Sequence, residues 1–289
     1  MTEAQEERNI FRVLSEYDRR IVYFLLFVIV TVVLVQPIGM PISVSPDTRT
    51  YHTVLTGLTR SDIVLFSLDT EFSGYMEIQS GVVATARVII EREAKMAIAI
   101  SHPEAVAIPD LLYSDLKAVM TQHNYVYGKD YVNLGYCYPN DASVSASAED
   151  FQSAIRQDYA GNPLSGTFLA AVRNWRDISL IICHTTGIRS GSLLNHFALR
   201  GTRMIVNCIG NMIAGQKTYL NAGTIQGILP AMRGGAELEF LIGAPASGLT
   251  AMDAFTLGHY MLMIFIIVGN IGYLGYGRYA TRKAAGGQS

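Results

Sequence analysis

Polar side chains that could do acid–base or ligand chemistry follow several apolar runs of the chain. Asp69 comes directly after one run, His102 after a second, and His184 after a third. We expect these runs to be parallel strands, whose carboxyl ends meet at the edge of a sheet where ligands bind. A carboxylate and two imidazoles at such an edge could move protons or hold a metal ion. Polar residues are also the ordinary way for a chain to leave a sheet, so both interpretations stay open.

The segment after the third run could hold an anion. It reads HTTGIRSGS over residues 184–192 and opens a predicted helix, whose free N–H groups attract negative charge. Thr186 and Ser190 add hydroxyl groups, and Arg189 adds a positive charge. The segment matches neither G-x-x-x-x-G-K-[ST] nor G-x-G-x-x-G, the two common phosphate-binding motifs. Ser190 could instead act only as a helix cap.

Other classes of chemistry lack their usual patterns. Residues 187–191 read GIRSG, which lacks the serine at the third position that a G-x-S-x-G nucleophile turn requires. The chain has no His-x-x-x-His and no Cys-x-x-Cys, and three cysteines are too few for a disulfide framework. With 22 basic against 24 acidic residues, there is no excess of positive charge to bind nucleic acid. The sequence therefore predicts no catalytic residue, no metal and no cofactor, and it favours a non-enzymatic role without deciding the question.

The elements that position the candidate residues read as a doubly wound α/β domain over residues 43–253. Apolar runs without alternation, each followed by a helical pattern, indicate a parallel sheet covered on both faces. We expect a mostly parallel sheet of about five strands, at residues 62–68, 96–100, 131–136, 178–183 and 204–209. A helix is expected to follow each strand, and the last of these helices covers residues 225–242.

Two segments with almost no charge flank this domain. Half of the residues are hydrophobic and only 16% are charged, against about 25% in a typical soluble domain. The deficit is concentrated at residues 21–42 and 254–277, which we interpret as two transmembrane helices. The alternative for the first segment is a signal peptide, and the alternative for the second is a buried core helix.

The flanking tails predict an orientation in the cell membrane. Positive residues gather outside the two apolar segments, in tails 1–20 and 278–289, and Arg49 alone lies close to their inner ends. The positive-inside rule then places both termini in the cytoplasm and the α/β domain outside. Tail 1–20 also has an amphipathic pattern, which fits either a helix on the membrane surface or a solvated extension of the first apolar segment.

Small residues in the second apolar segment predict helix packing. Gly269, Gly272 and Gly275 recur every three residues, and Asn270 lies among them. A glycine stripe lets another helix approach closely, and an amide can form a hydrogen bond across the contact. The partner could be the first apolar segment of the same chain or another subunit, and we favour assembly with another subunit.

Two stretches carry a resemblance to a known family. They are GKDYVNLGY at residues 128–136 and MRGGAELE at residues 232–239, the latter followed by Ile242–Gly243 and by GNIG at residues 269–272. In these stretches the chain resembles a family of prokaryotic membrane-anchored α/β proteins with two terminal transmembrane helices. The resemblance implies the architecture only, because the family has no established activity or catalytic residues to carry over.

Together these patterns predict a non-catalytic structural or accessory subunit of a membrane assembly. Its expected partners are the lipid bilayer and either other membrane subunits or a second copy of the chain, joined through the second apolar segment. The alternative is a membrane-tethered enzyme or a protein that binds a small ligand or anion at the strand ends.

Overall fold

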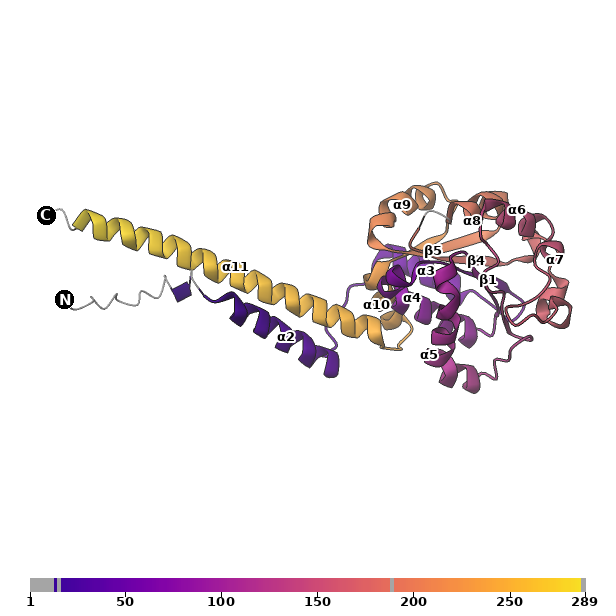
Figure 1. The fold of residues 1–289 in the computed structure, drawn as a ribbon, viewed down its shortest axis with the longest axis horizontal. Helices are drawn as coiled ribbons and strands as arrows, with labels where there is room; N and C mark the ends of the chain where they lie inside the picture. The colour runs from indigo at the N-terminus through magenta and orange to yellow at the C-terminus, as the bar shows by residue number, and fades with distance from the viewer. Residues whose placement is uncertain (1–12, 15–16, 188–189, 287–289) are drawn as a thin grey trace. The chain divides into compact units, whose positions relative to one another are not determined.

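The computed structural model describes residues 13–14, 17–187 and 190–286 of the protein, with side chains described as far as residue 278. The chain forms two compact units, one of residues 41–249 and the other of residues 1–40 together with 250–289. Figure 1 labels the helices and strands of both.

The larger unit alternates strands with helices. Its strands are β1 (Ile63–Asp69), β2 (Lys95–Ile100), β3 (Tyr131–Asn133), β4 (Leu180–Thr185), β5 (Arg203–Cys208) and β6 (Gly227–Pro230). Its helices are α3 (Pro46–Thr56), α4 (Phe72–Glu91), α5 (Ile108–Gln122), α6 (Asp141–Glu149), α7 (Phe151–Ala154), α8 (Ser190–His196), α9 (Ile213–Asn221) and α10 (Ala231–Leu241). Short 3₁₀ turns, among them η1 (Pro103–Ala107) and η6 (Gly210–Met212), complete the connections.

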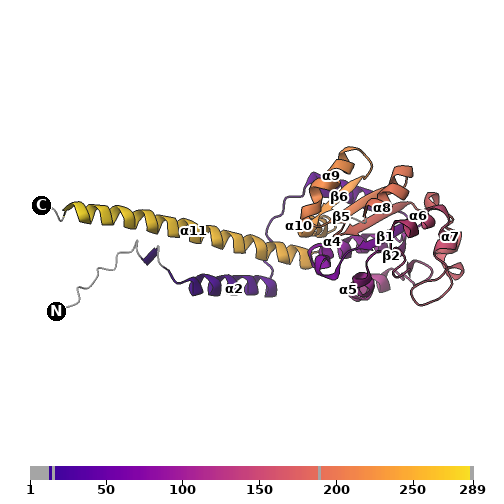
Figure 2. The same cartoon turned by 45° about the horizontal axis from the view of Figure 1, so that its top comes forward.

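The six strands form one parallel sheet in the order β3-β2-β1-β4-β5-β6. This confirms the α/β class and the parallel sheet that the apolar runs predict. The sheet is buried on both faces, and two hydrophobic clusters lie on its two sides. One cluster takes side chains from α3, α4, α5 and α10, and the other from α6, α7 and α8. Figures 1 and 2 show these helix layers from two directions.

The sheet has six strands where the sequence predicts about five, because residues 227–230, expected within a helix over residues 225–242, form the strand β6. This edge strand has only four residues, with Gly227 at its start and Pro230 at its end. So short a run carries no period of its own, so its apolar residues read as the first turn of α10. Glycine is required at position 227 because a Cβ there would lie 2.7 Å from the Cα of Tyr51 in α3.

The smaller unit pairs α2 (Arg19–Val35) with α11 (Ser247–Gly286), the part of α11 from residue 250 onward belonging to this unit. The two helices run antiparallel. Tyr17, just before α2, donates a hydrogen bond to the carbonyl of Phe265 at 3.0 Å. Further along, a Cβ on Gly258 would lie 3.5 Å from the side chain of Leu26.

One helix in the described part of the chain is long and apolar enough to cross a membrane, over Ser247–Arg278 of α11. Only 11% of its most apolar window is buried, unlike the core helix of a soluble domain. The prediction of two such helices is therefore supported for one of them. At 17 residues, α2 is about 26 Å long, short of a bilayer core of about 30 Å. Residues 36–40, which the sequence suggested as its extension, are not helical.

Candidate functional site

The strand order fixes where a crevice can form at the carboxyl edge of the sheet. From β1 the chain moves outward through β2 to β3, then returns to β4 on the other side of β1. The connections after β1 and β4 therefore leave in opposite directions. In doubly wound sheets, ligands bind at this switch point. Here it lies between the segments that begin at Asp69 and at Thr185.

Asp69 and Thr185 face each other across the switch point. They are register partners at the ends of β1 and β4, and the Thr185 hydroxyl lies 2.8 Å from Asp69 Oδ2. The same hydroxyl lies 2.8 Å from the carbonyl of Gly187 and 3.2 Å from its N–H. Asp69 is only 4% exposed and Thr185 is fully buried. The pair therefore fastens the two strand ends below the surface.

Thr186 joins the same two connections one residue further on. Its backbone N–H donates to the carbonyl of Asp69 at 3.0 Å, and its hydroxyl accepts from the N–H of Glu71 at 3.1 Å. The space around it is full, because a Cβ on Gly74 would lie 2.6 Å from its methyl carbon. Thr186 thus holds the first turn of α4 against the end of β4.

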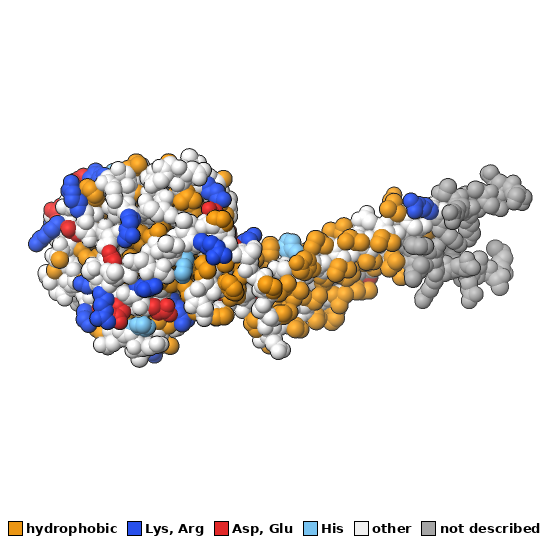
Figure 3. Space-filling view, turned by 180° about the vertical axis from the view of Figure 1, so that it is seen from behind, with side chains coloured by type: hydrophobic (Ala, Val, Ile, Leu, Met, Phe, Trp, Pro, Cys, Tyr) orange, Lys and Arg blue, Asp and Glu red, His pale blue; other side chains and the backbone are white. Residues whose placement is uncertain are grey.

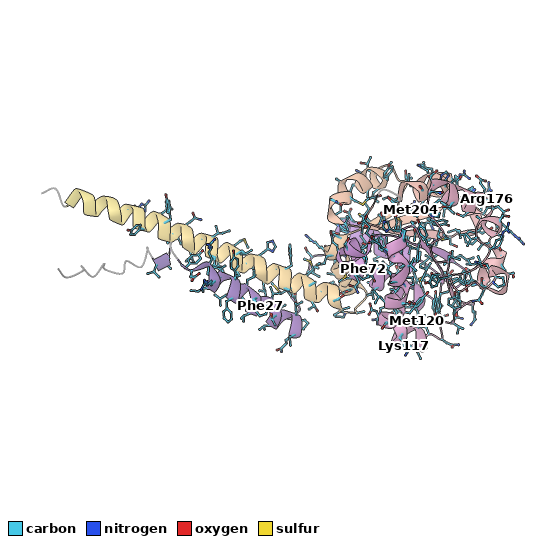
Figure 4. The ribbon with its side chains drawn as sticks, viewed as in Figure 1. Phe27, Phe72, Lys117, Met120, Arg176 and Met204 are labelled. Carbon is cyan, nitrogen blue, oxygen red and sulfur yellow. The ribbon has the colours of Figure 1, made fainter. Side chains whose placement is uncertain are left out.

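Carboxylates occupy the outer part of the rim. The Glu104 carboxylate, on the connection after β2, accepts from the N–H of Phe72 at 3.3 Å. Phe72 begins α4 (Figure 4), so this carboxylate takes the position where an anion would sit at a helix N-terminus. Glu71 lies beside it, with an oxygen 3.9 Å from His102 Nε2. The rim is therefore rich in hydrogen-bond acceptors, which favours a ligand that carries donors or positive charge over a phosphate.

His184 does not belong to this rim. It is fully buried and packs on the ring of Phe66 with centroids 4.3 Å apart. Asn207 Nδ2 lies 3.1 Å from its Nδ1, while Nε2 has no hydrogen-bond partner among the described residues. Burial lowers the pKa of His184 from 6.5 to about 3, which keeps the imidazole neutral. The side chain is part of the core and cannot reach a substrate at the rim.

The remaining residues of the predicted site do not lie together. Ser190, the first residue of α8, is buried and accepts a hydrogen bond from Gln216 of α9 at 3.3 Å. Arg189 lies outside the described residues. His102 is partly exposed, and its Nδ1 is buried without a partner in the described part of the chain. The structure thus brings Asp69, Thr186 and His102 to the switch point, while His184 and Ser190 serve packing.

Sequence reasoning missed Glu104 at the rim. It stands two residues after His102, in the first turn of η1. The rule that selected His102, a polar residue soon after an apolar run, could have selected Glu104 as well. Nothing in the sequence alone shows that its carboxylate turns back to the start of α4.

Of the three glycines predicted to pack, Gly269 lies against a residue of the same chain. A Cβ on Gly269 would lie 3.4 Å from the hydroxyl of Tyr17, so this glycine makes room within the chain. Gly272 is buried and Gly275 is half-buried. Asn270 is exposed, and its Nδ2 donates to the carbonyl of Ile266 one turn earlier at 2.8 Å. Of these four residues, Asn270 is the exposed one.

Metal-ligating side chains form no group that could hold an ion within the described ranges, where two cysteine thiols are buried. No group of three or more His, Cys, Asp or Glu side chains there is placed to hold a metal ion. Cys183 and Cys208 are buried in strands β4 and β5, and burial raises the pKa of both thiols.

Fold and site together define a doubly wound, six-stranded α/β protein with a long apolar C-terminal helix. We compared the chain with known protein families, with curated proteins and with solved structures, and none of the three comparisons found a match.

Proposed function

We propose that the protein is a non-catalytic structural or accessory subunit of a membrane assembly, anchored by both α2 and α11. The observation that carries this proposal is the exposed surface of the helix pair. Large apolar side chains cover it, as Figure 3 shows for one face. The exposed members include Tyr23, Phe24, Phe27, Ile264, Ile266, Ile267 and Ile271. Contiguous apolar surface of this kind is stable in lipid and costly in water.

The short length of α2 is offset by the segment that follows it. Backbone N–H groups of Ile38, Gly39 and Met40 donate to the carboxylate of Asp253 at 3.1, 2.8 and 3.0 Å. In lipid, an unpaired backbone group costs several kcal/mol. With these groups paired, residues 36–40 can complete a crossing that α2 alone is too short to make.

The rim supports a non-catalytic role because its polar groups bind one another. Asp69 accepts from Thr185, Thr186 accepts from Glu71, and Glu104 accepts from Phe72. A catalytic base would need a proton of the substrate within reach, and the imidazole of His184 is sealed in the core.

Membrane extraction tests the anchor. We expect the protein to stay in the membrane pellet after alkaline carbonate treatment; release into the supernatant would overturn the proposal. For topology, an exposed Ala160→Cys label site in a Cys137→Ser background is expected to react with an impermeant thiol reagent on intact cells. A Ser289→Cys site in the same background is expected to be protected.

The assembly contact is expected on the exposed surface of α11 around Asn270. We expect a native mass above that of one 31.6 kDa chain in mild detergent. Asn270→Leu is expected to reduce the assembled fraction, because it removes an amide that can bond across helices. If both the wild type and Asn270→Leu were monomers, the assembly part of the proposal would be wrong.

A second candidate function is the binding of a small cationic or amine ligand at the switch point. The strand order favours it, and the acceptor-rich rim selects the ligand class. The probes are Mg²⁺, Ca²⁺ and spermidine, with inorganic phosphate as the contrast, in thermal unfolding of the full chain. We expect a probe to raise Tm in the wild type and less in Glu71→Gln; no shift with any probe would eliminate this candidate.

A further inference from the structure

Helix α10 carries two buried carboxylates, one on each side of Leu238 in the sequence. Glu237 is fully buried and Glu239 is 2% exposed. The helix itself is fixed against α4, since a Cβ on Gly235 would lie 2.6 Å from the backbone nitrogen of Gly81. Two buried charges on a closely packed helix need partners, and each finds them on a different part of the chain.

Glu237 holds the point where the chain enters the α/β unit. Its Oε2 accepts from the N–H of Ser45 at 3.0 Å and from the hydroxyls of Ser45 and Thr48, both at 2.7 Å. Its Oε1 accepts from the guanidinium of Arg233 at 2.8 Å. Ser45 is the N-cap of α3, so Glu237 fixes the beginning of that helix through hydroxyl groups and a positive charge.

Glu239 holds the point where the chain leaves the unit. It accepts from the N–H groups of Ala246, Gly248 and Leu249 at 3.1, 3.0 and 2.9 Å. These amides surround the first turn of α11, which begins at Ser247. Gly248 permits the close approach, because a Cβ there would lie 2.9 Å from the Glu239 oxygen and 2.8 Å from Ser80 Cβ.

The two sites differ in how the negative charge is balanced. Glu237 has Arg233 one turn away on α10. Glu239 is bound only by backbone N–H groups, and in the described part of the chain no charged side chain of α4, α10 or α11 acts on it. Ser80 of α4 is the polar side chain beside this contact, and its hydroxyl has no partner among the described residues.

We propose that α10 is a double latch, in which Glu237 fastens the start of α3 and Glu239 fastens the start of α11, and that neutralising Glu239 releases the α11 side alone. The latch lets the α/β unit loosen its connection to the C-terminal helix while it keeps its N-terminal connection.

The acid–base properties of the two groups agree with this asymmetry. Burial raises the pKa of Glu239, and the N–H groups of residues 249, 248 and 246 offset the rise only in part. Burial acts on Glu237 in the same direction, but hydrogen bonds from Thr48, Ser45 and Arg233 outweigh it, and its pKa is lowered. As the pH falls, Glu239 therefore takes up a proton before Glu237 does. A protonated carboxyl loses the charge that strengthens its hydrogen bonds to N–H groups.

Hydrogen exchange of the full chain in detergent tests the latch with two matched variants. We expect Glu239→Gln to raise amide exchange at residues 246–249 about tenfold and to leave residues 45–48 unchanged. Glu237→Gln is expected to do the reverse. The proposal would be overturned if either variant raised exchange in both segments. It would also be overturned if neither variant raised exchange in either segment.

The wild type gives a second readout that needs no substitution, should a variant fail to fold. As the pH is lowered from 7.5, protection of residues 246–249, corrected for intrinsic exchange, is expected to fall at a higher pH than that of residues 45–48. Equal changes in both segments would contradict independent release.

Discussion

At the scale of single residues, His184 shows how a strand that runs two residues further than predicted changes the role of a side chain. The apolar run predicted a strand that ends at residue 183, which would leave His184 in the following loop. The strand instead ends at Thr185. Because side chains alternate along a strand, His184 points into one face and Thr185 toward the other. Thr185 therefore reaches Asp69 at the rim, and His184 is buried against Phe66.

The burial of His184 predicts a pH dependence of stability. Its pKa is about 3 in the folded protein and about 6.5 when unfolded, so the unfolded state takes up a proton first as the pH falls. The free energy of unfolding is expected to fall below pH 6.5, by about 2 kcal/mol between pH 7 and pH 5.

Urea unfolding of the wild type and of His184→Gln isolates this effect. The raised pKa of Glu239 acts with the opposite sign, since its folded state takes up the proton first. Subtracting the two pH profiles removes that contribution, which both proteins share. Parallel profiles would show that His184 is not buried as a neutral group.

The hydroxyl of Thr185 is predicted to stabilise the switch point. Thr185→Val keeps the shape of the side chain but removes the donor that faces Asp69. A buried hydrogen bond to a charged group is worth about 1.5–3 kcal/mol, so we expect a loss of that size in urea unfolding. Thr185→Ser keeps the hydroxyl and is expected to lose less; equal losses in the two variants would assign the effect to packing.

At the scale of elements, glycines decide how closely α4 and α10 pack. A Cβ on Gly235 would lie 2.1 Å from the hydroxyl of Ser80 and 2.6 Å from the backbone of α4. A flexible side chain can move aside, but a helix backbone cannot do so cheaply. Gly235→Ala is therefore expected to lower the free energy of unfolding by about 3 kcal/mol.

The matched control is Gly215→Ala in α9, where a Cβ meets nothing within 4 Å. Alanine is the better helix former, so this variant is expected to gain up to about 1 kcal/mol. A similar loss at both positions in thermal or urea unfolding would refute a specific contact between α4 and α10.

The elements that the sequence predicted well are those with strong local patterns. Runs such as residues 178–183 are apolar except for Ser179, because both faces of the sheet are covered. β6 was not predicted because its four residues, which begin with Gly227 and end with Pro230, have no measurable period. Helix α3 was not predicted because most of its residues are polar, although Tyr51 and Leu55 are fully buried.

The structure shows where the predicted site residues lie, and it separates them into two groups. The strand-end rule places Asp69, Thr186 and His102 at the same edge, as the sheet does. It cannot say which strand-end residues turn inward, so His184 and Ser190 were included although they serve packing. It cannot find contacts between distant segments either, such as Glu104 with Phe72.

At the scale of the whole molecule, the chain closes its second unit with residues from both ends of the sequence. Residues 38–40 and Asp253 are more than 200 positions apart, yet three N–H groups converge on one carboxylate. The sequence marked Asp253 only as the last residue before an apolar segment. Its position opposite the end of α2 explains why a charged residue stands there.

This convergence predicts that Asp253 holds the two helices together at one end. Asp253→Ala removes the acceptor of all three N–H groups, and Asp253→Asn leaves one neutral oxygen. We expect exchange of the amides of residues 38–40 to rise strongly in the alanine variant and to an intermediate extent in the asparagine variant. The other end, where Tyr17 donates to Phe265, is expected to keep its contact. Asn270→Leu is the control, because Asn270 donates to Ile266 of its own helix, and this variant should leave the amides of residues 38–40 protected. If Asp253→Ala left residues 38–40 protected, the carboxylate would not be what completes the short crossing of α2, and the two-helix anchor would lose its support.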